Sequence, residues 1–263
     1  MLSVDVAHGV DAGMFVRDYH PSARGTPLVY LHGLAGHGLV FEAVALHARL
    51  AAHRHVVPDL PGHGRSVPAP RPAPLTAFAD HFARWLAGRF GERVALVGHG
   101  LGGTLAALIA ERHPGLVRAL VDIDGPKTVD DCTSLRPAAE LTLTDLGGPG
   151  INALRDAVWR ASRGATTAED PGRVPCDARL LHAWGRELVS LAEEGSLAWK
   201  LARLSVPALF VTGSRGAISP RSLSRLAEAR VVVAEMPNAG PSPFLERPHE
   251  FAAILSDFLR FRS

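Results

Sequence analysis

The sequence predicts an α/β fold in which a mostly parallel central sheet is flanked by helices. Short apolar runs of strand length alternate with segments whose apolar residues recur at helical spacing. This alternation is typical of parallel strands, because each parallel pair needs a long return connection that a helix supplies. With 263 residues, 47% of them hydrophobic and 21% charged, the chain suits one large domain or a core domain with an insertion.

Six apolar runs predict the strands of the sheet. They are continuous rather than alternating, which indicates strands that are buried on both faces. In chain order they are residues 28–31, 55–57, 94–97, 120–123, 208–211 and 231–233.

Amphipathic segments between these runs predict the flanking helices. Residues 78–86 and 101–109 each keep their large apolar side chains on one helical face, and residues 251–259 form a third apolar stripe. Pro248 stands where that last helix would begin, and Ser219 followed by Pro220 indicates another helix start.

Residues 127–204 interrupt the alternation, because they contain helix-like runs but no strand signal. We interpret them as a helical cap inserted between two strands, which leaves residues 1–126 and 205–263 as the core domain. The proline-rich stretch 68–74 is read as a stiff surface connector, with a recognition segment as the alternative.

Composition and charge exclude several classes of function. The net charge is +2 without a run of Lys or Arg, which argues against a nucleic-acid-binding protein. The first residues have neither a basic nor an apolar signal region, and no apolar stretch reaches membrane-spanning length, so we expect a cytoplasmic protein. Cys132 and Cys176 form no metal motif; free thiols are expected, with a local disulfide as the alternative. No metal or cofactor is expected.

Four motifs follow the predicted strands in a fixed order. Residues 32–36 read HGLAG, residues 58–66 read PDLPGHGRS, and residues 98–103 read GHGLGG between a strand and a helix. Residues 237–248 then lead into the last amphipathic helix. In sequence and context these motifs resemble the α/β-hydrolase fold family, in which the third motif is the nucleophile elbow, normally Gly-x-Ser-x-Gly.

The resemblance also shows departures at all three positions of the family's Ser-His-Asp triad. Gly100 stands at the nucleophile position, Gly216 where the acid is expected, and Pro241 where the histidine is expected. Loss of the whole triad costs about 10⁶-fold in rate in enzymes that depend on it. The chain is therefore identified as a triad-lacking member of the family. Glycine at position 100 suits a strained elbow, so a positive φ is expected there.

The resemblance implies that the backbone part of the site persists. The N–H groups of Leu34 and Leu101 should still converge as oxyanion donors, because they depend on no particular side chain. The space left by Gly100 would let a bulky ligand reach the sheet. His32, within its loop, is a further ligand-contacting candidate, although we expect it mainly to organise that loop.

Other polar side chains are candidates near the same place. His37 is the first candidate for a general base that contacts the ligand. Asp124 follows a strand after which some relatives carry their acid; it is a catalytic candidate or, alternatively, a loop cap. His99 is expected to point away from the pocket as a buried, satisfied histidine. His63 and Asp59 are read as loop-fixing groups.

Trp159 and Trp184 lie in the predicted cap. They are expected to form its core, and the alternative is that they contact an aromatic substrate.

Taken together, these features favour a cofactor-independent catalyst of the lyase, cyclase or isomerase type in specialised metabolism. It would promote cyclisation, elimination, isomerisation or rearrangement of an apolar or aromatic small molecule that carries a carbonyl or a phenol. Two alternatives stay open: a non-catalytic protein that binds a small molecule or stabilises a partner, and a hydrolase with relocated catalytic residues. A histidine or acid within reach of the ligand would favour catalysis over binding alone.

Overall fold

The computed structural model describes residues 5–68, 71–136, 140–142, 144–145 and 176–260. Within them, eight strands form one sheet in the order β1-β2-β4-β3-β5-β6-β7-β8. β1 and β2 pair antiparallel, as do β2 and β4, and all other neighbours are parallel. The strands are β1 (Val6–Asp11), β2 (Met14–Tyr19), β3 (Gly25–Leu31), β4 (His53–Pro58), β5 (Val94–His99), β6 (Val117–Ile123), β7 (Ala208–Gly213) and β8 (Val232–Met236).

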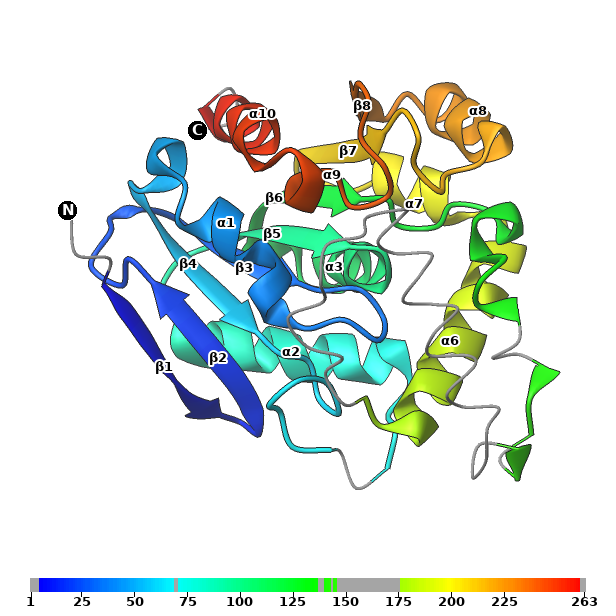
Figure 1. Cartoon of the computed structure of the whole chain (residues 1–263), viewed down its shortest axis with the longest axis horizontal. Helices are drawn as coiled ribbons and strands as arrows, with labels where there is room; N and C mark the ends of the chain where they lie inside the picture. Colours follow the sequence, from blue (N-terminus) through cyan, green and yellow to red (C-terminus); the bar gives the residue numbers. More distant parts are fainter. Residues whose placement is uncertain (1–4, 69–70, 137–139, 143, 146–175, 261–263) are drawn as a thin grey trace.

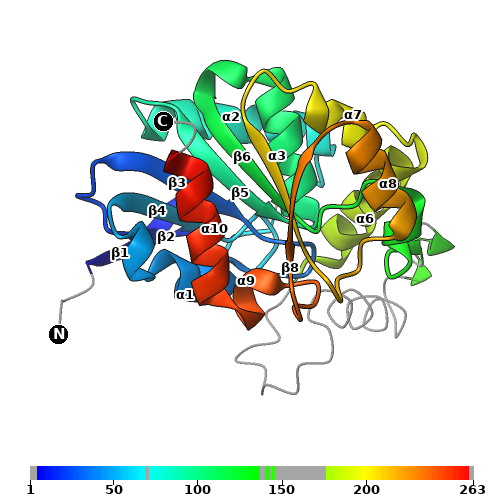
Figure 2. The ribbon, with the colours of Figure 1, turned by 90° about the horizontal axis from the view of Figure 1, so that it is seen from above.

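Helices cover both faces of the sheet, as Figures 1 and 2 show: α2 and α3 lie on one face, and α1 and α10 on the other. The α-helices are α1 (Glu42–Ala45), α2 (Leu75–Arg89), α3 (Leu101–Arg112), α6 (Ala178–Glu193), α7 (Leu197–Ala202), α8 (Pro220–Glu228), α9 (Pro243–Glu246) and α10 (Pro248–Arg260). Short 3₁₀ helices follow β3, α1, α3 and β6 at Gly38–Phe41, Ala48–Leu50, Pro114–Leu116 and Val129–Cys132. No helix in the described ranges combines the length and apolarity needed to cross a bilayer.

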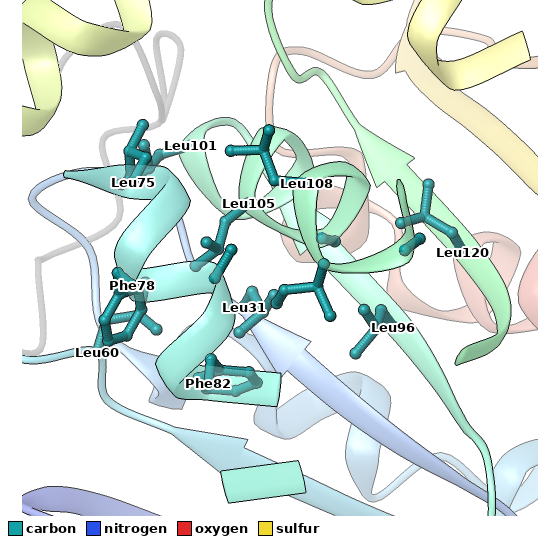
Figure 3. Close-up of a cluster of buried hydrophobic side chains, with 14 of the residues drawn as sticks. Leu31, Leu60, Leu75, Phe78, Phe82, Leu96, Leu101, Leu105, Leu108 and Leu120 are labelled. Carbon is teal, nitrogen blue, oxygen red and sulfur yellow. The ribbon is translucent and has the colours of Figure 1, made fainter. Parts of the chain in front are cut away.

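Two hydrophobic clusters hold these layers together, because successive side chains of each strand point to opposite faces. Leu31, Leu96 and Leu120 pack with α2 and α3 on one face, as Figure 3 shows. Tyr30 and Val97 pack with α1 and α10 on the other face. The central strands are therefore buried on both faces, as their continuous apolar runs predict.

The predicted fold class is confirmed, and each of the six predicted strands is present. The β1–β2 hairpin was not predicted, because it lies at the edge of the sheet and its outer strand is largely exposed. A turn with positive φ at Ala12 and Gly13 joins the two strands. The last strand, β8, was predicted at residues 231–233. It begins one residue later, at Val232, and extends to Met236.

The segment between β6 and β7 contributes α6 and α7. α6 packs against the 3₁₀ helix Val129–Cys132, whereas α7 contacts α3 and α8. The division into core (1–126 and 205–263) and cap (127–204) stays a prediction. The helix-like run at residues 154–159, with Trp159, lies outside the described residues. Cys132 and Cys176 are not joined by a disulfide, as expected.

A buried ion pair fixes the loop that follows β6. Lys127 and Asp122 are 2% and 1% exposed, and Lys127 Nζ donates to Asp122 Oδ2 at 2.8 Å. The same ammonium donates to the carbonyl oxygens of Gly125 and Pro126 at 2.8 and 3.3 Å. It also lies 4.9 Å from the centroid of the Phe210 ring. The ammonium group of Lys127 therefore joins the carboxylate of Asp122 to two carbonyl groups of the loop.

Removal of this lysine should destabilise the fold. We expect Lys127→Met to lower the free energy of unfolding by about 3–5 kcal/mol, since it leaves a buried carboxylate without its counter-charge. Urea unfolding followed by circular dichroism measures the change.

Two variants control this measurement. Lys200→Met makes the same change at the only other lysine of the chain, which is half-buried and forms no ion pair with a described residue; its cost should stay below about 1 kcal/mol. The double variant Lys127→Met/Asp122→Asn should recover part of the free energy of unfolding that Lys127→Met loses. Equal losses for the two lysine variants would contradict a structural role for the ion pair.

Candidate active site

Gly100 lies in a sharp turn between β5 and α3. Its backbone has φ 56° and ψ −115°, in the left-handed region that favours glycine, so the predicted elbow conformation is confirmed. The helix starts directly against the sheet: a Cβ on Gly102 would lie 2.0 Å from the carbonyl oxygen of Leu31. Only glycine at position 102 permits this approach. A Cβ on Gly100 itself would have Gly33 Cα, at 3.8 Å, as its nearest neighbour, so the space above the turn is open.

A cavity of about 90 Å³ lies above this turn, at the carboxyl ends of the parallel strands. This is where ligands bind in open α/β sheets, because the strand order reverses between β3 and β5. Loops after five strands contribute to its lining, and the segment between β6 and β7 closes the other side. The lining residues are Gly33, Leu34, His99, Gly100, Leu101, Asp124, Pro126, Asp131, Ser134, Leu135, Leu188, Ala217 and Pro241.

Two backbone N–H groups are available to a ligand in this cavity. Leu34 follows β3 and Leu101 begins α3, and neither N–H donates a hydrogen bond to a described residue. The N–H at the start of a helix has no partner within the helix, and the helix dipole adds partial positive charge there. The role of these two groups as oxyanion donors stays a prediction.

Two buried histidines hold the loop that carries Leu34. His32 Nε2 accepts from Leu60 N at 2.9 Å, while its Nδ1 bonds the carbonyl oxygen of Gly33 at 2.8 Å. His63 Nε2 accepts from Ala35 N at 3.3 Å. Burial lowers the pKa of His32 to about 3 and of His63 to about 4, so both rings are neutral at pH 7. His32 therefore organises the loop, as expected, and it is absent from the cavity lining.

Asp59 anchors the neighbouring loop. Its carboxylate accepts from Arg17 Nη1 at 2.8 Å, from Gly38 N at 2.7 Å and from Arg65 N at 3.0 Å. Burial by itself would raise the pKa of Asp59, but the hydrogen bonds from Arg17 and Arg65 outweigh it and hold the pKa below its ordinary value. The loop-fixing role expected for Asp59 and His63 is confirmed by these contacts.

His99 is the buried, hydrogen-bonded histidine that the sequence predicts. Its Nε2 meets the carbonyl oxygen of Pro241 at 3.0 Å and its ring packs on Phe244 with centroids 5.1 Å apart, and the residue is among those that line the cavity. Because Nε2 faces a carbonyl oxygen, it carries the proton and Nδ1 is left as an acceptor. Burial lowers the pKa of His99 to about 4. The ring therefore ties the loop after β8 to the end of β5.

Asp124 brings a carboxyl group into the cavity. Gly100 N donates to Ile123 O at 2.8 Å and Asp124 N donates to Val211 O at 3.0 Å, so the backbone around Asp124 is held beside the elbow. Asp124 has φ 48°, a conformation that is strained for a residue with a side chain. Burial raises its pKa well above the ordinary value, although Thr212 and the N–H of Ala217 oppose this shift.

Neither carboxyl oxygen of Asp124 makes a hydrogen bond of normal geometry with a described residue. Both carboxyl oxygens are buried, and the residue as a whole is 8% exposed. Because Thr212 and the N–H of Ala217 act on the carboxylate, the catalytic role and the alternative of a loop cap both stay predictions.

Asp124 lies where an acid at position 216 would be. A Cβ on Gly216 would lie 3.0 Å from Asp124 Oδ2, 2.9 Å from Thr212 Oγ1 and 2.8 Å from Gly213 O. The loop after β7 therefore has no room for a larger side chain at position 216 while Asp124 occupies this space. The carboxyl group beside position 216 is therefore that of Asp124, which follows the strand next to the expected one.

His37, the predicted base, is buried at the start of the 3₁₀ helix Gly38–Phe41 and is absent from the cavity lining. Its contact with a ligand stays a prediction. The sequence reasoning missed Asp131, Ser134, Leu135 and Leu188, all within the predicted cap. Only their apolar or polar character was visible in the sequence. Their position depends on how α6 and the 3₁₀ helix before it fold over the sheet.

Comparisons with known proteins agree with this geometry. The alpha/beta hydrolase family matches residues 28–254. The pimeloyl-[acyl-carrier protein] methyl ester esterase of Chromobacterium violaceum is 32% identical, covering 90% of this chain and 95% of that protein. The enzyme of the same name from Aeromonas salmonicida is 26% identical over 90% of this chain and 96% of that protein.

Among solved structures, N-acyl homoserine lactonase AidH complexed with N-butanoyl homoserine superposes with a TM-score of 0.74. It is 21% identical and covers 98% of this chain and 97% of that chain. This neighbour supports the fold. The two named relatives are esterases, which overturns the prediction of a non-hydrolytic catalyst. With residues 28–254 matched and the elbow turn in place, the chain belongs to the alpha/beta hydrolase family.

Proposed function

We propose that the protein hydrolyses a small carboxylic ester by direct attack of water, with Asp124 as the general base. It is a family member without a Ser-His-Asp triad, because Gly100, Gly216 and Pro241 supply none of the three side chains. This is a hydrolase with relocated catalytic residues. A substrate with a small acyl group suits a cavity of about 90 Å³.

The observation that carries the proposal is the carboxyl group of Asp124 in the same cavity as the two free N–H groups. Its raised pKa makes its anionic form a stronger base than an ordinary aspartate. The open space above Gly100 gives an attacking water room where the family's serine would stand. Nucleophile, base and oxyanion donors are therefore supplied without a side chain at position 100.

The reaction balances as a simple hydrolysis. The substrate carbonyl oxygen accepts hydrogen bonds from Leu34 N–H and Leu101 N–H, which stabilise the charge that develops on it. Asp124 removes a proton from water while the water oxygen bonds to the carbonyl carbon. When the tetrahedral intermediate collapses, the carbon–oxygen bond to the leaving group breaks, and Asp124 returns the proton to the leaving alkoxide. The products are a carboxylic acid and an alcohol.

The proposed role of Asp124 is tested by substitution. Asp124→Asn should lower the turnover of p-nitrophenyl acetate or a short methyl ester by roughly 10²–10⁴-fold, the contribution of a general base. Turnover of the wild type should rise with pH through the raised pKa of Asp124, since only the carboxylate accepts a proton. Asp130→Asn, an exposed change in the same segment, is the matched control and should keep its activity. A pH-independent rate that survives Asp124→Asn would exclude this base.

The Asp124→Asn variant should be less active than the wild type but more stable at high pH. Because the folded-state pKa is raised, the carboxyl group destabilises the fold progressively as pH rises from its ordinary pKa of 3.8 through the raised value. Asparagine resembles the protonated form, so Asp124→Asn should raise the melting temperature at pH 8 and leave it nearly unchanged at pH 4. A melting temperature lowered at both pH values would mean that lost activity reflects damage to the fold.

Restoring serine should not restore the family's mechanism. We expect Gly100→Ser to lower turnover, because its hydroxymethyl group takes the space of the attacking water and Pro241 supplies no base. The wild type should show no labelling by a fluorophosphonate probe and no acyl-enzyme in intact-protein mass spectra. Stoichiometric labelling of a serine in the wild type would place the nucleophile elsewhere.

The predicted role of His37 is tested in the same assay. If His37 is the base, His37→Ala should cause the 10²–10⁴-fold loss instead of Asp124→Asn. Binding of a substrate analogue without any turnover in the wild type would favour the remaining alternative, a non-catalytic ligand-binding protein.

A further inference from the structure

A second cavity, of about 390 Å³, lies apart from the one at Gly100. It forms where the β1–β2 turn, the loop before α2 and the first turns of α2 and α6 come together, at the bottom of Figure 1. The two cavities share no lining residue. Its volume falls within the range of about 300–1,000 Å³ that is typical of small-molecule sites.

Aromatic side chains form one wall of this cavity. The rings of Phe78 on α2 and Trp184 on α6 are 5.1 Å apart at an interplanar angle of 42°. The ring of the exposed His81 lies 6.3 Å from Phe78 and continues the wall toward solvent. Phe78 and Trp184 are 5% and 1% exposed, so only a small part of each ring meets the cavity, and that part is an aromatic, apolar surface.

The rest of the lining presents carbon atoms instead of polar groups. Pro61, Val67 and Pro68 contribute aliphatic surface, and no Asp, Glu, Lys or Arg is among the described lining residues. Two N–H groups of lining residues are already paired: Trp184 Nε1 donates to Ala73 O at 2.8 Å, and Val67 N donates to Gly13 O at 3.0 Å. A charged ligand would therefore lose its hydration without compensation.

From the volume, the aromatic wall and the paired polar groups, we propose that this cavity is a second binding site, for a small, flat, uncharged aromatic molecule. Apolar cavities are poorly filled by water and take up hydrophobic solutes of matching size. The site is independent of the ester chemistry at Gly100, and its test measures binding alone.

The test uses N-phenyl-1-naphthylamine, an uncharged aromatic probe whose fluorescence rises in an apolar site. The wild type should bind one equivalent, with a dissociation constant on the order of 100 µM or tighter for a molecule of this size. Ala77 is an exposed residue of α2 that lines the cavity, so Ala77→Trp should fill the space and weaken binding at least tenfold.

Ala87→Trp is the matched control. It makes the same change at another exposed alanine of α2 that does not line the cavity, and it should bind the probe as the wild type does. Thermal melts should show that both variants fold. The proposal is overturned if the wild type fails to bind the probe, or if Ala77→Trp and Ala87→Trp bind it equally well. Because activity is not part of the readout, failure of the ester hydrolysis proposal would leave this result unaffected.

Discussion

The site depends on how closely the start of α3 packs against the neighbouring strands. A Cβ on Gly102 would overlap the carbonyl of Leu31, and a Cβ on Gly103 would lie 2.1 Å from Asp122 Oδ1. Without side chains at these positions, the helix begins directly above β3 and β6. Leu101 N–H, the loop after β3 and the loop after β6 are thereby brought to one cavity. The left-handed turn at Gly100 is the geometric consequence of this packing.

The loop that carries Leu34 is held by groups that do not depend on the residue at position 100. His32 and His63 are kept neutral by burial, and each accepts a backbone N–H through Nε2. Asp59 supports the adjoining loop through the guanidinium of Arg17. An oxyanion site built from backbone groups in this way can persist although no serine is present. Its geometry is maintained by the fold.

The absence of three side chains led the sequence interpretation toward non-hydrolytic chemistry, and the hydrolase relatives correct that step. The interpretation equated lost residues with lost chemistry. The structure shows a carboxyl group in the space beside Gly216, supplied by Asp124 from the adjacent strand. Residues from neighbouring parallel strands meet at the same edge of the sheet, so a functional group can come from a different strand and reach the same place.

The sequence by itself determined the fold class, the positions of six strands and the elbow at Gly100. These follow from local signals: apolar runs, helical periodicity and a glycine where φ is positive. The expectation of burial on both faces holds for the central strands but is wrong for β8, an edge strand whose Val232 and Val233 are exposed. The sequence did not determine the β1–β2 hairpin, the hydrogen-bond partner of the His99 ring, or the residues that α6 brings to the cavity. Those depend on packing between segments far apart in the chain, such as the 3.0 Å contact of His99 Nε2 with Pro241 O. Tertiary structure alone decided which polar groups are paired by short hydrogen bonds, and that the carboxyl group of Asp124 is buried beside Thr212 and Ala217.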